Sequence, residues 1–283
     1  MNPMTHIKLC GFADEADANR SGQIKALTEN AIPYLEIRGV DGTNIADLSR
    51  EAALQFKSEL DAAGIKVWSI GSPAGKTQIS GDFEQDIARF KHLLDMAEIF
   101  EAKRIRLFSF YGTDGEDSYF EEVCRRLNVF CGLCEERGVI PCHENEKGIY
   151  GENAPRCLAI HKAIPRLKAV FDPANFVQCD QDTLEAWEML HPYITYMHIK
   201  DSLYDGTVVL PGTGDGNVPE IIGKYVAQGG KLFTLEPHLS DFVGLSDLEQ
   251  ANNKSLVGHM TFATPEAAFD AAAQNLVKIL NNL

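Results

Sequence analysis

The chain has 283 residues, of which 45% are hydrophobic and 24% are charged, and its formal net charge is −15. This composition is typical of a globular protein, and the acidic balance argues against nucleic acid as a partner, because non-specific affinity for DNA comes mostly from Lys and Arg. No apolar run is long enough to span a membrane and the N-terminus lacks a signal-peptide pattern, so we expect a cytoplasmic protein without a membrane partner.

Eight short runs rich in β-branched and aromatic residues predict strands along the chain. They cover residues 6–12, 33–38, 65–70, 104–110, 139–144, 168–172, 194–200 and 232–237. Helical patterns separate these runs. The stretch 47–64 has apolar residues at helical spacing, the stretch 82–100 begins with Asp82 as a plausible N-cap, and Pro219 and Pro265 open two later helices.

Eight alternations of strand and helix predict an α/β fold, the (β/α)8 TIM barrel, which typically takes about 250 residues. A doubly wound open sheet is the alternative, but the first strand of such a sheet is usually followed by a glycine-rich fingerprint. Here the first strand leads into GFADEAD. Because no linker or low-complexity segment divides the sequence, we predict one barrel domain over residues 1–283.

Seven cysteines are scattered through the chain, and an odd number without regular spacing argues against a disulfide framework. Cys131 and Cys134 have the C-x-x-C spacing of zinc and redox sites, but no second Cys or His pair lies nearby at a suitable spacing. Both fall on the apolar face of an amphipathic helical pattern, so we predict that they are buried structural residues.

Polar residues stand at the ends of the last four predicted strands: Glu144, Asp172, His198 and Glu236. Active sites of barrels form at the carboxyl ends of the strands, so these side chains should converge. A helix cap or a core histidine explains each residue taken alone. Together, buried carboxylates would repel one another, and a divalent cation would resolve this conflict. Oxygen ligands with one nitrogen suit Mn²⁺, Mg²⁺, Co²⁺ or Zn²⁺, and we predict one such ion.

The loop after the third predicted strand reads GSPAGKT at residues 71–77. Its glycines are one residue too close for a phosphate-binding loop and Pro73 lacks an N–H donor, so we expect no ATP binding. On the rim of a barrel, Lys76 could instead bind the substrate, and a solvated loop lysine is the alternative. Lys200 lies two residues beyond His198 and would point to the same side of the strand.

Three further segments have open interpretations. Glu36 and Arg38 end the second strand, where they either line the floor of the site, with Glu36 in contact with the substrate, or form an internal ion pair. The glycine-rich stretch 211–216 either presents backbone N–H groups to an anion or simply turns the chain. The long connection 238–263 is expected to act as a lid or as a subunit contact in a homo-oligomer.

The order Glu, Asp, His, Glu on strands five to eight resembles the xylose-isomerase-like barrel superfamily. The resemblance rests on HENEKGIYGE, FDPANF, HIKDS, PGTGDG and LEPHL, covers nearly the whole chain, and is greatest to bacterial sugar phosphate isomerase/epimerase proteins. It implies an enzyme of carbohydrate metabolism with a small sugar-like substrate. Glu144 and Glu236 would take and return a proton through a metal-stabilised enediolate, while Asp172 and His198 would mainly hold the ion.

Two branches of that superfamily match less well. Endonuclease IV enzymes hold three zinc ions through further histidines, one of them three residues after the strand-six Asp, where this chain has Asn175. Ketose 3-epimerases usually carry the same histidine, and an Arg six residues after the strand-seven His, where this chain has Tyr204. We therefore expect one metal ion, no nucleic acid, and contact between Asn175 and the substrate.

The residues leave the second half of the reaction open. Return of the proton to the opposite face of the same carbon gives an epimer, and return to the neighbouring carbon gives an isomer. Loss of a neighbouring hydroxyl would instead make the protein a dehydratase of an inosose-like or dehydroshikimate-like substrate. A non-catalytic, metal-dependent sugar-binding barrel is the remaining alternative.

Overall fold

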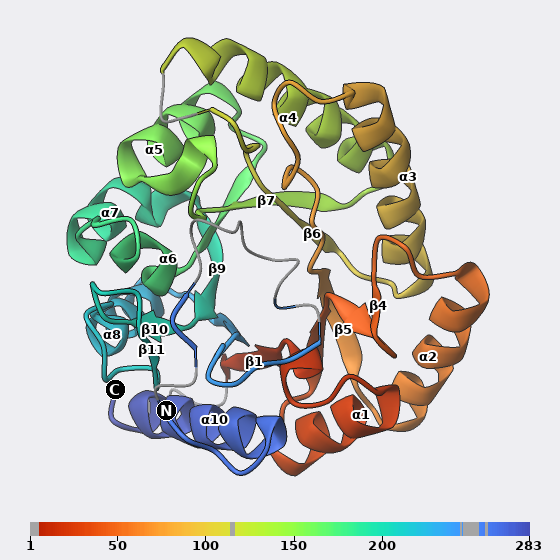
Figure 1. Ribbon diagram of the computed structural model, residues 1–283, viewed down its shortest axis with the longest axis vertical. Coiled ribbons are helices and arrows are strands. Elements are labelled where there is room, and N and C mark those ends of the chain that lie inside the picture. Colours follow the sequence, from red (N-terminus) through yellow and green to blue (C-terminus); the bar gives the residue numbers. More distant parts are fainter. Residues whose placement is uncertain (1–5, 114–116, 244, 246–254, 258–259) are drawn as a thin grey trace.

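Eight parallel strands form a closed barrel in the order β1-β12-β9-β8-β7-β6-β5-β2 (Figure 1). The computed structural model describes residues 6–113, 117–243, 245, 255–257 and 260–283. The barrel strands are β1 (Lys8–Gly11), β2 (Tyr34–Ile37), β5 (Lys66–Ile70), β6 (Arg104–Leu107), β7 (Ile140–Glu144), β8 (Lys168–Phe171), β9 (Ile194–Ile199) and β12 (Leu232–Leu235). One barrel strand lies in each predicted run, so the predicted (β/α)8 barrel is confirmed.

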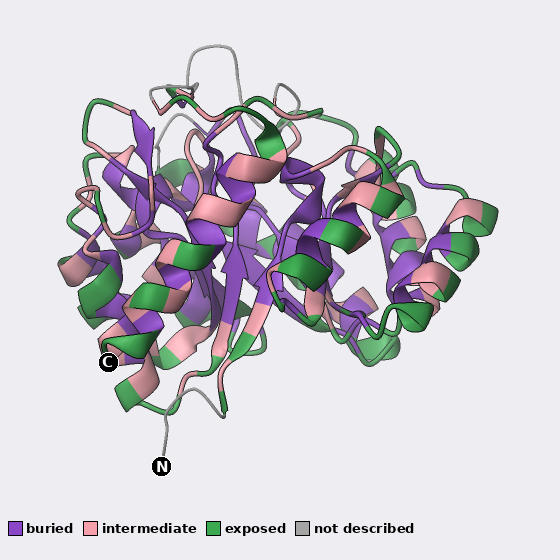
Figure 2. Cartoon of the chain, turned by 90° about the horizontal axis from the view of Figure 1, so that it is seen from below, coloured by how far each residue is buried: buried purple, intermediate pink, exposed green. Residues whose placement is uncertain are grey.

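Helices surround the barrel, with buried faces toward the strands and exposed faces outward (Figures 1 and 2). In α2 the buried positions Ala53, Phe56 and Leu60 recur at helical spacing. The helices are α1 (Arg20–Glu29), α2 (Arg50–Ala62), α3 (Phe83–Ile99), α4 (Phe120–Glu136), α5 (Ala154–Ala163), α6 (Pro173–Val177), α7 (Thr183–Leu190), α8 (Val218–Ala227) and α10 (Pro265–Asn281). Within the described ranges, no helix has both the length and the apolarity that crossing a lipid bilayer requires.

Local signals fix several helix boundaries as the sequence predicts. The Asp82 carboxylate accepts a hydrogen bond from the Glu84 backbone N–H and begins α3. Thr264 begins α10 in the same way, and Ser49 begins α2. Part of the predicted lid or subunit contact over 238–263 lies outside the described residues.

The two cysteines with C-x-x-C spacing are buried, free thiols on α4. Burial raises the pKa of Cys131 to about 12, and burial likewise raises the pKa of Cys134. Both side chains belong to the main hydrophobic core. The prediction of buried structural cysteines is confirmed.

The glycine-rich stretch 211–216 wraps around a carboxylate of the chain itself. Asp201 follows β9 in the short hairpin of β10 (Asp201–Ser202) and β11 (Val208–Val209). The N–H groups of Gly212 and Gly214 donate to Asp201 Oδ2 at 2.8 and 2.9 Å, and that of Gly216 donates to Oδ1 at 3.0 Å. A Cβ on Gly214 would lie 2.6 Å from the same carboxylate. The segment therefore both turns the chain and presents N–H groups to an anion, and the anion is internal.

Replacing Asp201 tests how much this internal anion site stabilises the fold. Asp201→Ala should lower the free energy of unfolding by about 2–4 kcal/mol, because buried N–H groups lose their acceptor. Urea denaturation measures the change. As a control, Asp61→Ala removes a carboxylate that is 55% exposed and paired with Lys57, which should cost no more than about 0.5 kcal/mol. Equal losses in the two variants would contradict this account.

Candidate metal centre

Four buried polar side chains meet at the carboxyl end of the barrel: Glu144, Asp172, His198 and Glu236. Glu144 ends β7, Asp172 follows β8, His198 lies in β9, and Glu236 follows β12. Because these strands are consecutive neighbours in the barrel, their ends adjoin. One ligand atom of each residue lies within 4.8 Å of those of the other three. The structure thus brings together the four residues that the sequence singled out, and metal binding by them stays a prediction.

His198 lies among carboxylates. Its Nδ1 is 2.7 Å from Glu144 Oε1 and 3.1 Å from Glu236 Oε2. Burial by itself lowers the pKa of this imidazole, but the carboxylates of Glu144, Glu36 and Glu236 outweigh it and raise the pKa well above its ordinary value. The cluster therefore favours positive charge at its centre.

Two carboxylate oxygens of the cluster are buried without a hydrogen bond. They are Asp172 Oδ2 and Glu236 Oε2. Lys200 Nζ lies 3.0 Å from Asp172 Oδ2, yet burial still raises the pKa of Asp172 to about 6. Each of these oxygens is compensated by one neighbouring group, Lys200 for Asp172 and His198 for Glu236, and a bound cation would add to this compensation. Three carboxylates and one imidazole are also a ligand set suited to a divalent ion, so these residues fit the predicted metal.

Glu36 lies on the far side of His198 from the cluster. Its Oε2 is 3.2 Å from His198 Nε2 and accepts a hydrogen bond from Thr234 at 2.8 Å, while Oε1 accepts one from Tyr196 at 2.9 Å. The side chain is fully buried. Contact with the substrate stays a prediction for Glu36, but these contacts favour a different role. They hold the imidazole so that Nδ1 faces the cluster, as carboxylates behind metal-binding histidines do.

Two buried arginines neutralise the glutamates. Arg106 Nη1 lies 3.1 Å from Glu144 Oε2 and 3.7 Å from Glu236 Oε1, and Arg38 Nη1 lies 2.9 Å from Glu236 Oε1. Arg38 was among the residues that the sequence singled out, whereas Arg106 was not. A signal was present, since Arg104 and Arg106 alternate with apolar residues in β6, a pattern that directs both side chains to one face of a strand.

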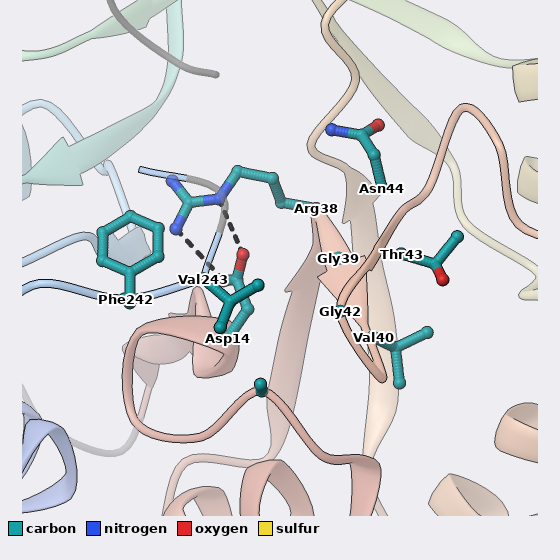
Figure 3. Close-up of a pocket in the computed structure, with 10 residues that line it drawn as sticks. Asp14, Arg38, Gly39, Val40, Gly42, Thr43, Asn44, Phe242 and Val243 are labelled. Carbon is teal, nitrogen blue, oxygen red and sulfur yellow. Dashed lines mark hydrogen bonds and ion pairs between the residues drawn. The ribbon is translucent and has the colours of Figure 1, made fainter. Parts of the chain in front are cut away.

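Arg38 joins the cluster to a small cleft of about 80 Å³ on the rim (Figure 3). Its guanidinium also contacts Asp14 at 2.8 Å and Glu15 at 3.0 Å, and stacks between the rings of Phe12 and Phe242. Arg38 therefore forms internal ion pairs, but with Asp14, Glu15 and Glu236, and the described residues show none between Arg38 and Glu36. The lining residues of the cleft are Asp14, Ala18, Arg38, Gly39, Val40, Gly42, Thr43, Asn44, Phe242 and Val243.

The remaining predicted substrate contacts are engaged in polar contacts at the mouth of the barrel. Lys76 Nζ lies 2.8 Å from Glu146 Oε2, and the lysine side chain is only 7% exposed. Lys76 is thus not a solvated loop lysine. Asn175 donates its backbone N–H to Asp172 Oδ1 at 3.0 Å and its side-chain amide to the Asn145 carbonyl, while its own Oδ1 is buried without a hydrogen bond. Contact of Lys76, Lys200 and Asn175 with a substrate stays a prediction.

A family model described as the xylose isomerase-like TIM barrel matches residues 24–253. The chain belongs to this family. A 3-dehydroshikimate dehydratase of Bacillus anthracis is 22% identical over 179 residues, which span 61% of this chain and 63% of the dehydratase.

Solved structures of the family share the fold at low identity. The probable dehydratase of Bacillus anthracis has a TM-score of 0.71 at 18% identity, covering 96% of this chain and 98% of its own. The IOLI protein with a bound zinc atom has a TM-score of 0.73 at 15% identity, covering 98% of this chain and 99% of its own. The D-psicose 3-epimerase of Clostridium cellulolyticum H10 has a TM-score of 0.72 at 14% identity, covering 97% of this chain and 99% of its own.

Metal content tests the centre directly. After loading with Mn²⁺ and gel filtration, elemental analysis should find about one ion per chain, as a single coordination sphere requires. The double variant Asp172→Asn, Glu236→Gln should bind far less, because it replaces two anionic ligands by neutral amides. Three tightly bound zinc ions per chain would contradict the prediction.

Glu36 provides a test of the contacts behind the ligands. Glu36→Gln should weaken metal binding about 10–100-fold, since the imidazole loses a charged partner that fixes its orientation. Competition with a chelating dye measures the affinity without any substrate. Glu122→Gln, which alters a surface pair with Arg125, is the control and should leave the affinity unchanged. Unchanged affinity in Glu36→Gln would show that His198 is held by other contacts.

Proposed function

We propose that this protein is a divalent-metal-dependent isomerase or epimerase of a sugar, sugar phosphate or related polyol ketone. The observation that carries the proposal is the buried cluster of three carboxylates and one imidazole at the carboxyl end of the barrel. Membership in a family that contains epimerases and a dehydratase supports chemistry at a carbon beside a carbonyl. Zinc in the IOLI protein, a structural neighbour, supports a divalent ion.

The ion, when bound, would supply a Lewis acid that polarises the carbonyl and acidifies the neighbouring C–H. Glu144 and Glu236 are the candidate bases, because each has a carboxylate oxygen within 3.1 Å of His198 Nδ1 and so lies in the cluster. Arg106 contacts both glutamates and orients them.

The two glutamates differ in their surroundings. Glu236 contacts both Arg38 and Arg106, whereas Arg106 is the arginine paired with Glu144. Burial alone would raise the pKa of Glu236, but Lys200 and His198 outweigh it and hold this pKa well below the ordinary value. Glu236 is therefore a weak base, and we assign removal of the substrate proton to Glu144 and delivery of a different proton, taken up from solvent, to the opposite face by Glu236.

A dehydratase is the second candidate, and the same asymmetry favours it. Elimination of water needs one base and one proton donor, whereas epimerisation is served by a base on each face of the carbon. The sequence similarity to a 3-dehydroshikimate dehydratase supports this alternative. Its substrate would still carry a carbonyl beside the abstracted proton.

Proton NMR in D₂O separates the candidates. The Mn²⁺-loaded protein would be given a panel of ketoses, ketose phosphates, inososes and 3-dehydroshikimate, with each product mixture examined after removal of the metal. Deuterium in an epimeric or isomeric product supports the first candidate, and loss of water supports the second. Saturable binding without exchange of any C–H would contradict both and indicate a sugar-binding barrel.

Substitution of the glutamates tests their assigned roles. Glu144→Gln should reduce solvent exchange of the substrate proton about 10²–10⁴-fold, because the amide keeps an oxygen but is almost non-basic. In an epimerase, Glu236→Gln should still exchange the proton while failing to complete the conversion. Metal content is measured on each variant, and Glu122→Gln is the activity control. Near-native turnover in both variants with metal bound would exclude the two-glutamate mechanism.

A further inference from the structure

The opposite end of the barrel carries a ring of cations without carboxylate partners. Strands β1, β5, β6 and β8 begin with Lys8, Lys66, Arg104 and Lys168, and Lys231 directly precedes β12. Within the part of the chain that the structure describes, none of these five side chains forms an ion pair or donates a hydrogen bond. Many other cations of this acidic chain do pair, including those at the metal centre.

A depression of about 680 Å³ opens among these strand starts. Three of the five cations line it, together with His191, and its lining contains no Asp or Glu. The lining residues are Lys8, Trp68, Arg104, His191, Pro192, Ile194, Thr195, Tyr225, Gln228, Gly229, Gly230, Lys231 and Leu232. In a chain with a net charge of −15, this is a local concentration of basic side chains.

Aromatic rings hold two of these cations in place. The Arg104 guanidinium carbon lies 4.0 Å from the centroid of the Trp68 ring, and Lys8 Nζ lies 5.8 Å from the same ring and 5.4 Å from that of Tyr34. Stacking on a ring satisfies the flat face of a guanidinium but leaves its N–H donors in the plane. Arg104 Nε is buried and has no acceptor. Within the described residues the terminal Nη groups of Arg104 also have no acceptor, and since they are not among the buried atoms they are available to a ligand.

The backbone leaves space beside the cations. Gly229 has φ +88°, and a Cβ built on it would meet no atom within 4 Å, so the turn before β12 is open. Gly230 packs against Tyr225 so closely that a Cβ would lie 2.4 Å from the ring. A side chain at Gly230 would displace Tyr225, which lines the depression.

We propose that this depression is a binding site for a small, multiply charged anion, a phosphorylated or polycarboxylated metabolite. The Arg104 guanidinium provides paired donors that match a phosphate or carboxylate, and Lys8 and Lys231 add charge. The site lies at the opposite end of the strands from the metal centre. It is therefore distinct from the proposed reaction and independent of it.

Tryptophan fluorescence gives a direct test, because Trp68 lines the depression while Trp187, the other tryptophan, is fully buried behind the lining residues His191 and Tyr225. Pyrophosphate and citrate are titrated into Trp187→Phe protein at constant ionic strength, with NaCl as the reference. Pyrophosphate should give a saturable change in Trp68 emission. Isothermal titration on the unsubstituted chain checks the same binding without the Trp187 substitution.

Variants connect the signal to the named residues. Arg104→Gln and Lys8→Gln should each weaken pyrophosphate binding at least about tenfold, as loss of a charged contact implies. Lys278→Gln, which removes an exposed cation on α10, is the matched control and should leave binding unchanged. Saturation by pyrophosphate alone identifies a phosphate site, and saturation by both anions identifies a site for multiple charge. A response no greater than that to NaCl, or one equal in all variants, would overturn the proposal.

Discussion

Compensation of buried negative charge is the constraint on which the interior of this barrel depends. Glu144, Asp172 and Glu236 end neighbouring strands and have almost no contact with water, so their mutual repulsion is weakly screened. Arg106 and Lys200 reach the same carboxylates from β6 and from the end of β9. Removing one partner from such a network leaves an uncompensated charge, which costs far more than a surface pair contributes. The strand ends therefore determine where the three carboxylates lie. The carboxylates in turn require positively charged partners such as Arg106 and Lys200 in the barrel interior.

The buried carboxylate of Glu36, behind His198, is compensated in a similar way. Glu36 is fully buried, and burial by itself would raise its pKa, yet His198 and Arg106 lower it and keep the carboxylate charged. Tyr196 and Thr234 complete its hydrogen bonds from two other strands. Polar contacts thus connect residues of β2, β9 and β12 around the imidazole of His198. Rigid support of this kind is what a metal ligand needs if its geometry is to persist when the ion leaves.

The sequence predicted those features that depend on one segment at a time. Strand runs, the N-cap of α3 and the four polar strand ends could all be read from local patterns, and the eight alternations of strand and helix predicted the barrel. Features that require two distant segments could not be read in this way. The role of Arg106 depends on its contact with Glu144, which lies 38 positions later in the chain. Glu36 and His198, which are also in contact, are 162 positions apart. The glycines of 211–216 likewise look like a general anion site until Asp201 is placed among them. Sequence patterns show which side chains can bind charge, whereas the fold decides which charge they meet.

One carboxylate has consequences for how this barrel can change. Asp172 uses Oδ1 to begin α6 and Oδ2 to contact Lys200, and the same side chain is one of the four in the cluster. A side chain longer by one methylene would move one of these oxygens out of place, and a shorter one would lose both. Point substitution is therefore a poor route to a new catalytic centre here. Divergence of specificity among barrels with this arrangement should instead concentrate in the rim loops, where length and sequence vary without disturbing a helix start. Attempts to redirect the protein to another substrate would accordingly begin at the loops around Lys76 and Phe242 and leave the end of β8 intact.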